Sequence, residues 1–168
     1  MAERKVDSKI RKYAVFTLLC SSLPVLSLVL GCTPEPFPTI LPSVDLPIPA
    51  GQSKAIIDEI IRVDDDNFVD IPFQVNVETM RNARVLGSFM AAGGAGDDIK
   101  VFILDEIDYI NWFNGHHVEG LYNSGKITIA KIDVPITTSG KYHLVFDNRF
   151  SPFSNKNVLA KVHLYWSD

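Results

Sequence analysis

The sequence predicts an all-β domain over residues 52–168, an antiparallel two-sheet β-sandwich or jelly roll of seven or eight strands. Three observations support this fold class. Apolar residues recur at every second position, turn-forming residues separate these stretches at short intervals, and one short segment alone suggests a helix. A signal or anchor helix is predicted over residues 1–31, followed by a proline-rich linker over residues 32–51.

The first 31 residues have the parts of an export signal. Five basic residues and two acidic ones precede an uncharged run from Tyr13 to Gly31, and Val29-Leu30-Gly31-Cys32 closes it. The run resembles a bacterial lipoprotein signal, which implies that Cys32 receives a diacylglyceryl group and becomes the new amino terminus. Two alternatives remain, an uncleaved anchor and simple secretion. A spanning helix needs roughly 20 apolar residues, and this run is slightly shorter and contains Pro24.

All three alternatives place the carboxy-terminal part outside the cytoplasm, and we expect a lipid-anchored protein on the extracytoplasmic face of the cell membrane. Removing the five basic and two acidic residues before Cys32 from the 16 and 20 of the whole chain leaves 11 against 18, a net charge of −7. Nucleic acid is therefore not an expected partner, because phosphate backbones require clustered Lys and Arg. Cys20 and Cys32 both precede the domain, which leaves no thiol for a disulfide within it.

The linker is defined by its prolines. Six of them lie between Cys32 and Gly51: Pro34, Pro36, Pro38, Pro42, Pro47 and Pro49. Proline fixes φ and removes a hydrogen-bond donor, so the segment suits neither a helix nor the interior of a sheet. We expect an extended, semi-rigid stalk that reaches at most roughly 60 Å at about 3.1 Å per residue.

Strict alternation predicts the individual strands. Apolar and polar residues alternate over Ile71–Glu78, and over Lys141–Phe146 the alternation points Tyr142, Leu144 and Phe146 inward. Val158, Ala160, Val162, Leu164 and Trp166 continue the pattern at the end of the chain. The run Ile99–Leu104 is apolar on both faces and is typical of a central strand. Further strands are expected at Ala55–Val63, Ala83–Met90 and Ile127–Val134, the last with a bulge near Ala130-Lys131.

Turn residues separate these strands. The expected turns are Gly93–Gly96, interpreted as a hairpin connection, Asn114-Gly115, Asn123–Gly125, Ser139-Gly140, Asp147–Phe150 and Ser151-Pro152. One segment departs from the β pattern: Asp105 can cap a short helical turn through Ile107, Ile110 and Trp112, and Asn114-Gly115 would end it.

Several segments of the second half are similar to the Golgi-dynamics (GOLD) domain, the β-sandwich of eukaryotic cargo receptors, and to a group of exported bacterial proteins. The similarity covers Asp97 to Trp166. It rests on Asp98–Val101 after a glycine loop, on Gly140–Asn148, and on Ser151 followed by Lys156-Asn157-Val158. The chain lacks the receptors' paired cysteines, coiled coil and carboxy-terminal membrane span, so a cargo-sorting role does not carry over. The resemblance implies the fold and a binding use of it.

No pattern in the sequence predicts catalytic residues, a metal site or a cofactor. His116 and His117 are adjacent and would point to opposite sides of an extended chain, while His143 and His163 are expected to face solvent. The acidic runs Asp64–Asp66 and Asp97-Asp98 lack the glycine and glutamate spacing of a helix-loop-helix calcium site, which leaves a different loop calcium site or a solvated turn as alternatives. There is no Gly-x-Ser-x-Gly nucleophile motif.

The best candidate for a partner-binding surface follows the strand Ile99–Leu104. It consists of Tyr109, Trp112, Phe113, His116 and His117, because rings with polar edges suit recognition. A structural alternative is that Trp112 or Phe113 plugs one end of the sandwich. We therefore expect a non-catalytic, lipid-anchored binding or adhesion module of the cell envelope, whose partner is an extracytoplasmic protein or a glycan. The alternatives are a carbohydrate-binding module that stacks sugars on Tyr109, Trp112 and Phe113, an accessory subunit of an envelope assembly and, last, a hydrolase.

Overall fold

The computed structural model describes residues 51–94 and 96–168. Within them lie eight strands and one helix. In chain order these are β1 (Gln52–Val63), β2 (Phe68–Val75), β3 (Arg81–Ala92), β4 (Ile99–Asp105), α1 (Glu106–Phe113), β5 (Tyr122–Ile127), β6 (Ile129–Pro135), β7 (Gly140–Asp147) and β8 (Lys156–Ser167). The predicted signal, Cys32 and the proline-rich linker lie outside the described residues.

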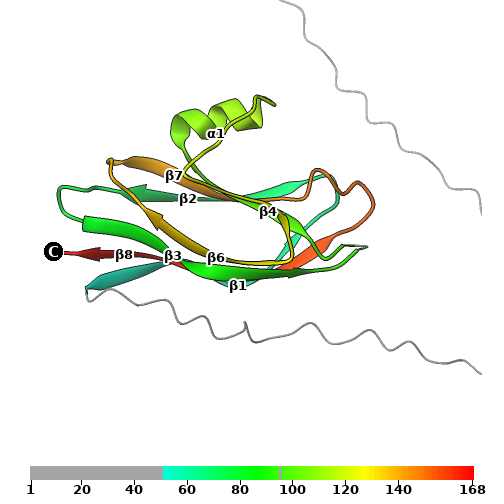
Figure 1. Ribbon diagram of the computed structural model, residues 1–168, viewed down its shortest axis with the longest axis horizontal. Helices are drawn as coiled ribbons and strands as arrows, with labels where there is room; N and C mark the ends of the chain where they lie inside the picture. Colours follow the sequence, from blue (N-terminus) through cyan, green and yellow to red (C-terminus); the bar gives the residue numbers. More distant parts are fainter. Residues whose placement is uncertain (1–50, 95) are drawn as a thin grey trace, which may run out of the picture. The chain divides into compact units, whose positions relative to one another are not determined.

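The strands form two antiparallel four-stranded sheets, with the orders β1-β8-β3-β6 and β2-β7-β4-β5. Figure 1 shows the two sheets as stacked layers, with α1 on the outer side of the second sheet. One hydrophobic cluster, with fully buried residues such as Phe89 from the first sheet and Phe146 from the second, fills the space between the layers. The predicted all-β class and the sandwich are therefore confirmed.

Most of the predicted strand phases are correct. Tyr142, Leu144 and Phe146 point into the core, as do the alternating residues of β8 from Val158 to Leu164. The predicted central strand is β4, which lies between β7 and β5. Pro72 lies in β2, an edge strand of its sheet, which is the kind of strand that tolerates proline.

Three expectations about connections are wrong. The segment Ile127–Val134 is not one bulged strand, because β5 ends at Ile127 in one sheet and β6 begins at Ile129 in the other. The pairing of β6 with β3 runs without a register shift. Asn123–Gly125 lies within β5, where it disrupts the register with β4 and Gly125 has a φ of +63°. Gly93–Gly96 joins strands of different sheets and is therefore not a hairpin turn.

The loops at one end of the sandwich are held by buried polar side chains. Lys156 is buried, and its Nζ donates to the carbonyl oxygen of Gly93 at 2.7 Å and lies 3.3 Å from Oδ1 of Asp98. Asn148 directly follows β7, is fully buried, and donates from Nδ2 to the carbonyls of Ser154 and Asp64 at 2.8 and 3.0 Å. The predicted turn at Asp147–Phe150 thus exists, and a side-chain amide fixes it. Among the described residues, no helix is long and apolar enough to cross a bilayer.

Candidate functional site

Helix α1 forms where the sequence predicts it. Asp105 is the N-cap, and its Oδ1 accepts a hydrogen bond from the backbone N–H of Asp108 at 2.8 Å. At the other end the Asn114 side chain donates to the carbonyl of Ile110 at 2.8 Å, and Gly115 takes a φ of +84°. Both ends of this eight-residue helix are therefore fixed by local chemistry.

The inner side of α1 packs on the outer face of the sheet. Trp112 is buried in a second cluster with Phe102, Leu104 and Val145. Phe68 meets the Trp112 ring edge-on at a centroid distance of 5.0 Å, and the Arg149 guanidinium lies 3.9 Å above it. Trp112 therefore does not plug an end of the sandwich, as the structural alternative proposed, but anchors α1 over the middle of a sheet.

A polar cluster lies beneath the amino-terminal half of α1. Nδ1 of His143 is 2.9 Å from Oδ1 of Asp70, and its Nε2 is 2.9 Å from Oε2 of Glu106. The Tyr109 ring stacks on the imidazole, and Nζ of Lys141 lies 3.0 Å from Oε2 of Glu106. We call Asp70, Glu106, Tyr109, Lys141 and His143 the His143 cluster; it joins β2, β7 and α1.

The position of His143 contradicts the expectation that it faces solvent. Its side chain is only 2% exposed, because α1 covers the outer face of β7. A carboxylate can only accept hydrogen bonds, and a neutral imidazole has a single N–H. Both ring nitrogens of His143 are therefore satisfied together only when the ring is protonated. His163 also departs from the expectation: it is partly covered, and its Nε2 lies 3.7 Å from Oδ2 of Asp58.

The cluster shifts the pKa values of its members on α1. The hydrogen bond from His143, followed by that from Lys141, lowers the pKa of the Glu106 carboxyl below its ordinary value. Burial raises the pKa of the Tyr109 hydroxyl, and the nearby carboxylates of Asp70 and Glu106 raise it further. The two shifts favour an ionised Glu106 and a neutral Tyr109.

The outer side of α1 carries an exposed apolar row. Ile107, Ile110 and Phe113 are 72%, 50% and 56% exposed, and their spacing of three places them on one side of the helix. We call these three residues the α1 face. The Phe113 ring also touches Phe68 at a centroid distance of 6.0 Å, so this side chain lies against the sheet at one edge.

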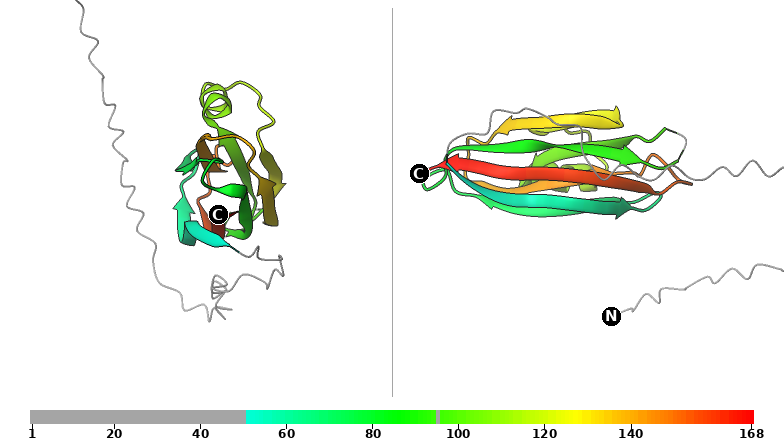
Figure 2. Two further views of the ribbon diagram at one scale, coloured as in Figure 1. Left: turned by 90° about the vertical axis from the view of Figure 1, so that its left-hand side faces the viewer. Right: turned by 90° about the horizontal axis from the view of Figure 1, so that it is seen from below.

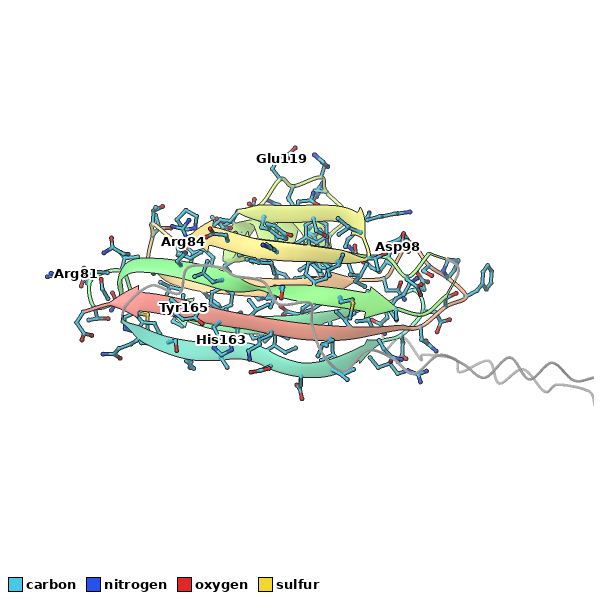
Figure 3. All side chains as sticks on the ribbon, turned by 60° about the horizontal axis from the view of Figure 1, so that its bottom comes forward. Arg81, Arg84, Asp98, Glu119, His163 and Tyr165 are labelled. Atoms are coloured by element: carbon cyan, nitrogen blue, oxygen red, sulfur yellow. The ribbon has the colours of Figure 1, made fainter. Side chains whose placement is uncertain are left out.

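The structure separates the predicted partner-binding residues into two groups. Phe113, His116 and His117 are exposed, whereas Trp112 is buried and Tyr109 is covered on one side by His143. Nε2 of His117 lies 3.2 Å from Oε1 of Glu119, and Figure 3 shows Glu119 at the tip of the loop after α1. Ile107 and Ile110 were not among the predicted contacts. Their spacing from Phe113 in a capped helix is the signal that identifies them.

Basic side chains adjoin the carboxy-terminal end of α1. Arg149, stacked on Trp112, pairs with Asp147 at 2.9 Å. Next to it the Phe150 ring lies under two ammonium groups, with the Nζ atoms of Lys126 and Lys100 at 4.2 and 5.5 Å from the ring centroid. Lys100 and Lys126 are direct cross-strand neighbours, so two positive charges meet on one ring.

The acidic loops have their own contacts. Oδ1 of Asp97 accepts from the backbone N–H of Gly93 at 2.6 Å, Asp98 faces the buried Lys156, and Asp64 pairs with Arg62 at 2.8 Å. Across residues 51–94 and 96–168, no three His, Cys, Asp or Glu side chains converge where they could hold a metal ion. These carboxylates instead brace the loops in which they lie.

No protein-family model matches this chain, and no curated protein matches it in sequence.

Proposed function

We propose that the chain is a non-catalytic binding module of the cell envelope, anchored by a lipid on Cys32 and presented on the proline-rich stalk, which docks a protein partner on the α1 face. The anchor and the location rest on the sequence of residues 1–51. The binding role rests on the surface of the folded domain. The two parts have separate tests.

The observation that carries the binding role is the exposure of Ile107, Ile110 and Phe113 on a helix that cannot move freely. Trp112 and the His143 cluster hold α1 against the sheet. A rigid apolar row loses little conformational entropy when a partner covers it, and its burial releases about 25 cal/mol per Å². The row is therefore suited to serve as the apolar centre of an interface.

The surroundings of the α1 face indicate the chemistry of the partner. Lys100 and Lys126 take part in none of the ion pairs found in the described residues, and they lie with Arg149 and Phe150 at one end of the helix. An acidic side chain on the partner would relieve the repulsion between the two lysines. We therefore expect a protein partner with an apolar anchor and an acidic rim.

The carbohydrate-binding alternative has weaker support. Stacking on a sugar requires a flat ring with a free face, and Trp112 lies buried between Arg149, Phe68 and the sheet. One face of the Tyr109 ring is covered by His143, at a centroid distance of 3.7 Å. Phe113 alone of the three proposed rings is largely exposed. A hydrolase also has little support, since the carboxylates of Asp70 and Glu106 occupy both nitrogens of His143.

The finer classification of the fold belongs to the proposal as well. A strand order of β1-β8-β3-β6 facing β2-β7-β4-β5 supports a jelly roll, the double-sheet arrangement of eight antiparallel strands. The similarity to the GOLD domain rests on the segments quoted above, of which Gly140–Asp147 forms β7 and lies at the centre of the second sheet.

The binding role is tested by site-specific photo-crosslinking in cells that produce the full chain. A photoreactive residue at Ile110 should give one dominant adduct with an envelope protein, and Phe113→Asp should abolish it. The same residue at Thr137, exposed on a connection away from α1, serves as the control. Adducts at Ile110 that are no stronger than those at Thr137 would rule out the α1 face as a docking site.

The lipid anchor is tested by the intact mass of the detergent-extracted protein. We expect a chain that begins at Cys32 and carries the mass of attached acyl groups. A Cys32→Ser variant should keep its first 31 residues or leave the membrane fraction. A mature protein that still begins near Met1 would refute the anchor, and the crosslinking result would stand independently.

A further inference from the structure

Within the part of the chain that the structure describes, no helix lies on the outer face of the sheet β1-β8-β3-β6 (Figure 2). An apolar row crosses this open face at right angles to the strands, through direct register partners. Ile60 pairs with Leu159, Leu159 with Met90, and Met90 with Ile129, so that each of the four strands contributes one residue. Ile60 and Ile129 at its two ends are 47% and 39% exposed.

The neighbouring row on the same face is charged, and its signs are asymmetric. In register order it consists of Asp58 on β1, Lys161 on β8, Ser88 on β3 and Lys131 on β6. Asp58 contacts Lys161 at 3.7 Å. Lys131 takes part in no ion pair among the residues of the described part, so this row is negative at its β1 end and positive at its β6 end.

This pattern is complementary to itself. Consider a two-fold axis that runs parallel to the strands, in the plane between the two copies and midway between β8 and β3. This axis would place β1 over β6 of the second copy and β8 over its β3. Rows would be preserved, because such an axis leaves positions along the strands unchanged. Ile60 would then meet Ile129, Leu159 would meet Met90, and Asp58 would meet Lys131 of the second copy. Each of these contacts would occur twice.

We propose that the open face of the sheet β1-β8-β3-β6 binds a second copy of this chain in a symmetric, face-to-face dimer. Sheets that pack face to face keep their strands within about 30° of each other, so this correspondence holds best at the centre, where the apolar row lies. Figure 3 shows Tyr165 and His163 on β8 of this face. Tyr165 lies in register with Arg84 on β3, and the same axis would place it over Arg84 of the second copy, a cation–π arrangement.

The size of the face is sufficient for a stable dimer. Three strands of 12 residues and one of 7, about 4.8 Å apart and rising about 3.3 Å per residue, present an area on the order of 700 Å² per copy. This is close to the roughly 800 Å² per partner of a standard interface. The interface lies on the opposite sheet from α1. The inference therefore does not depend on the proposed function, and the α1 faces of both copies would remain free.

The test is the molecular mass of the purified full chain in detergent, measured by analytical ultracentrifugation over a range of protein concentrations. We expect a dimer in equilibrium with the monomer. Asp58→Lys and Lys131→Asp should each raise the dissociation constant by about tenfold or more, because each variant opposes like charges twice. The double variant Asp58→Lys/Lys131→Asp should restore dimerisation, since it exchanges the charges across the interface.

A matched control separates this contact from the one within the chain. Asp58→Lys/Lys161→Asp restores the intrachain pair but leaves the positive charge introduced at position 58 opposite Lys131 of the second copy, so it should remain a weak dimer. Circular dichroism and thermal unfolding check that all variants fold. A monomer at every concentration, or equal rescue by both double variants, would overturn the proposal. A monomer would also leave this face to another occupant, such as the linker of the same chain.

Discussion

The imidazole of His143 and the phenol ring of Tyr109 lie flat against each other, with centroids 3.7 Å apart and planes inclined by 2°. This stack joins α1 to β7, while Asp70 and Glu106 hold the imidazole by its two nitrogens. His143, on the outer side of its sheet, therefore attaches α1 to β7. The helix that carries the α1 face is thus attached to the sheet by its inner side.

Replacing His143 should destabilise the domain. We expect His143→Ala to lower the free energy of unfolding by about 2–3 kcal/mol, because it removes a buried imidazole that is hydrogen-bonded to two carboxylates and stacked on Tyr109. Chemical denaturation followed by tryptophan fluorescence measures the loss. His116→Ala, on an exposed ring, should stay within about 0.5 kcal/mol of the unmodified protein. Equal effects of the two substitutions would contradict the role of His143.

Stability should fall in acid partly through Glu106. Its pKa is lowered in the folded state from an ordinary value of 4.5, so the folded protein binds this proton less readily than the unfolded chain. The stabilisation by ionised Glu106 is complete above pH 4.5, its ordinary pKa, and is lost as the pH falls through the lowered pKa of the folded state. Below pH 4.5, the denaturation midpoint of Glu106→Gln should therefore change less steeply with pH than that of the unmodified protein. If the denaturation midpoints of the two proteins changed equally with pH in acid, this assignment would be refuted.

Tyr109 should contribute at the alkaline end with the opposite sign. Its pKa is raised above 10.0 in the folded state. The stabilisation by the neutral hydroxyl is therefore complete below pH 10.0, its ordinary pKa, and disappears as the pH rises through the raised pKa of the folded state. Tyr109→Phe keeps the stacked ring and removes the ionisable hydroxyl. We expect it to reduce the loss of stability at alkaline pH, measured by denaturation midpoints, with Tyr165→Phe on the other sheet as a control.

Trp112 and Phe113 are neighbours in sequence with opposite roles. Trp112→Ala should cost about 3–5 kcal/mol of stability, the usual range for removing a buried tryptophan. Phe113→Ser removes an exposed ring and should leave the unfolding free energy within about 1 kcal/mol. Thermal unfolding of both variants compares them directly. A large loss from Phe113→Ser would show that this ring belongs to the core and is not part of a docking surface.

The structural features that depend on a few neighbouring residues are predictable from the sequence. The cap at Asp105, the end of α1 near Asn114-Gly115 and the inward phase of β7 are all consequences of a few consecutive residues. The split between Ile127 and Ile129 is not predictable in this way, because a chain that changes sheets and a strand with a bulge both shift the alternation by one position.

The candidate site is only half predictable for a different reason. The alternation assigns His143 to the outer side of β7, and this is correct, but solvent does not reach that side because α1 covers it. Whether a helix folds back over a sheet is a tertiary property. The same covering buries Trp112 and turns Ile107 and Ile110 outward. The residue types thus predict a contact region, and only the packing of α1 shows which rings remain available.

Substitution of Asn148 tests whether its side-chain amide holds the loops at one end of the sandwich. Its Nδ2 donates to the carbonyls of Ser154 and Asp64, while the backbone N–H of Asn148 donates to the carbonyl of Asn67 at 2.9 Å. The side chain is fully buried, so no water replaces it easily. Asn148→Ala should cost about 1–3 kcal/mol, because the partly buried carbonyls of Ser154 and Asp64 lose their donor.

Asn148→Asp should cost more than Asn148→Ala, although aspartate nearly matches asparagine in shape. The substitution replaces a donor by an acceptor and aims a carboxylate at two carbonyl oxygens in a buried site, where an unpaired charge is expensive. Protonation removes the charge, so part of the loss should be recovered as the pH falls towards the pKa of the new carboxyl. Urea denaturation at several pH values measures this, with the exposed Gln74→Glu as the control for an added charge. An Asp variant as stable as the Ala variant at neutral pH would mean that the amide does not hold these loops.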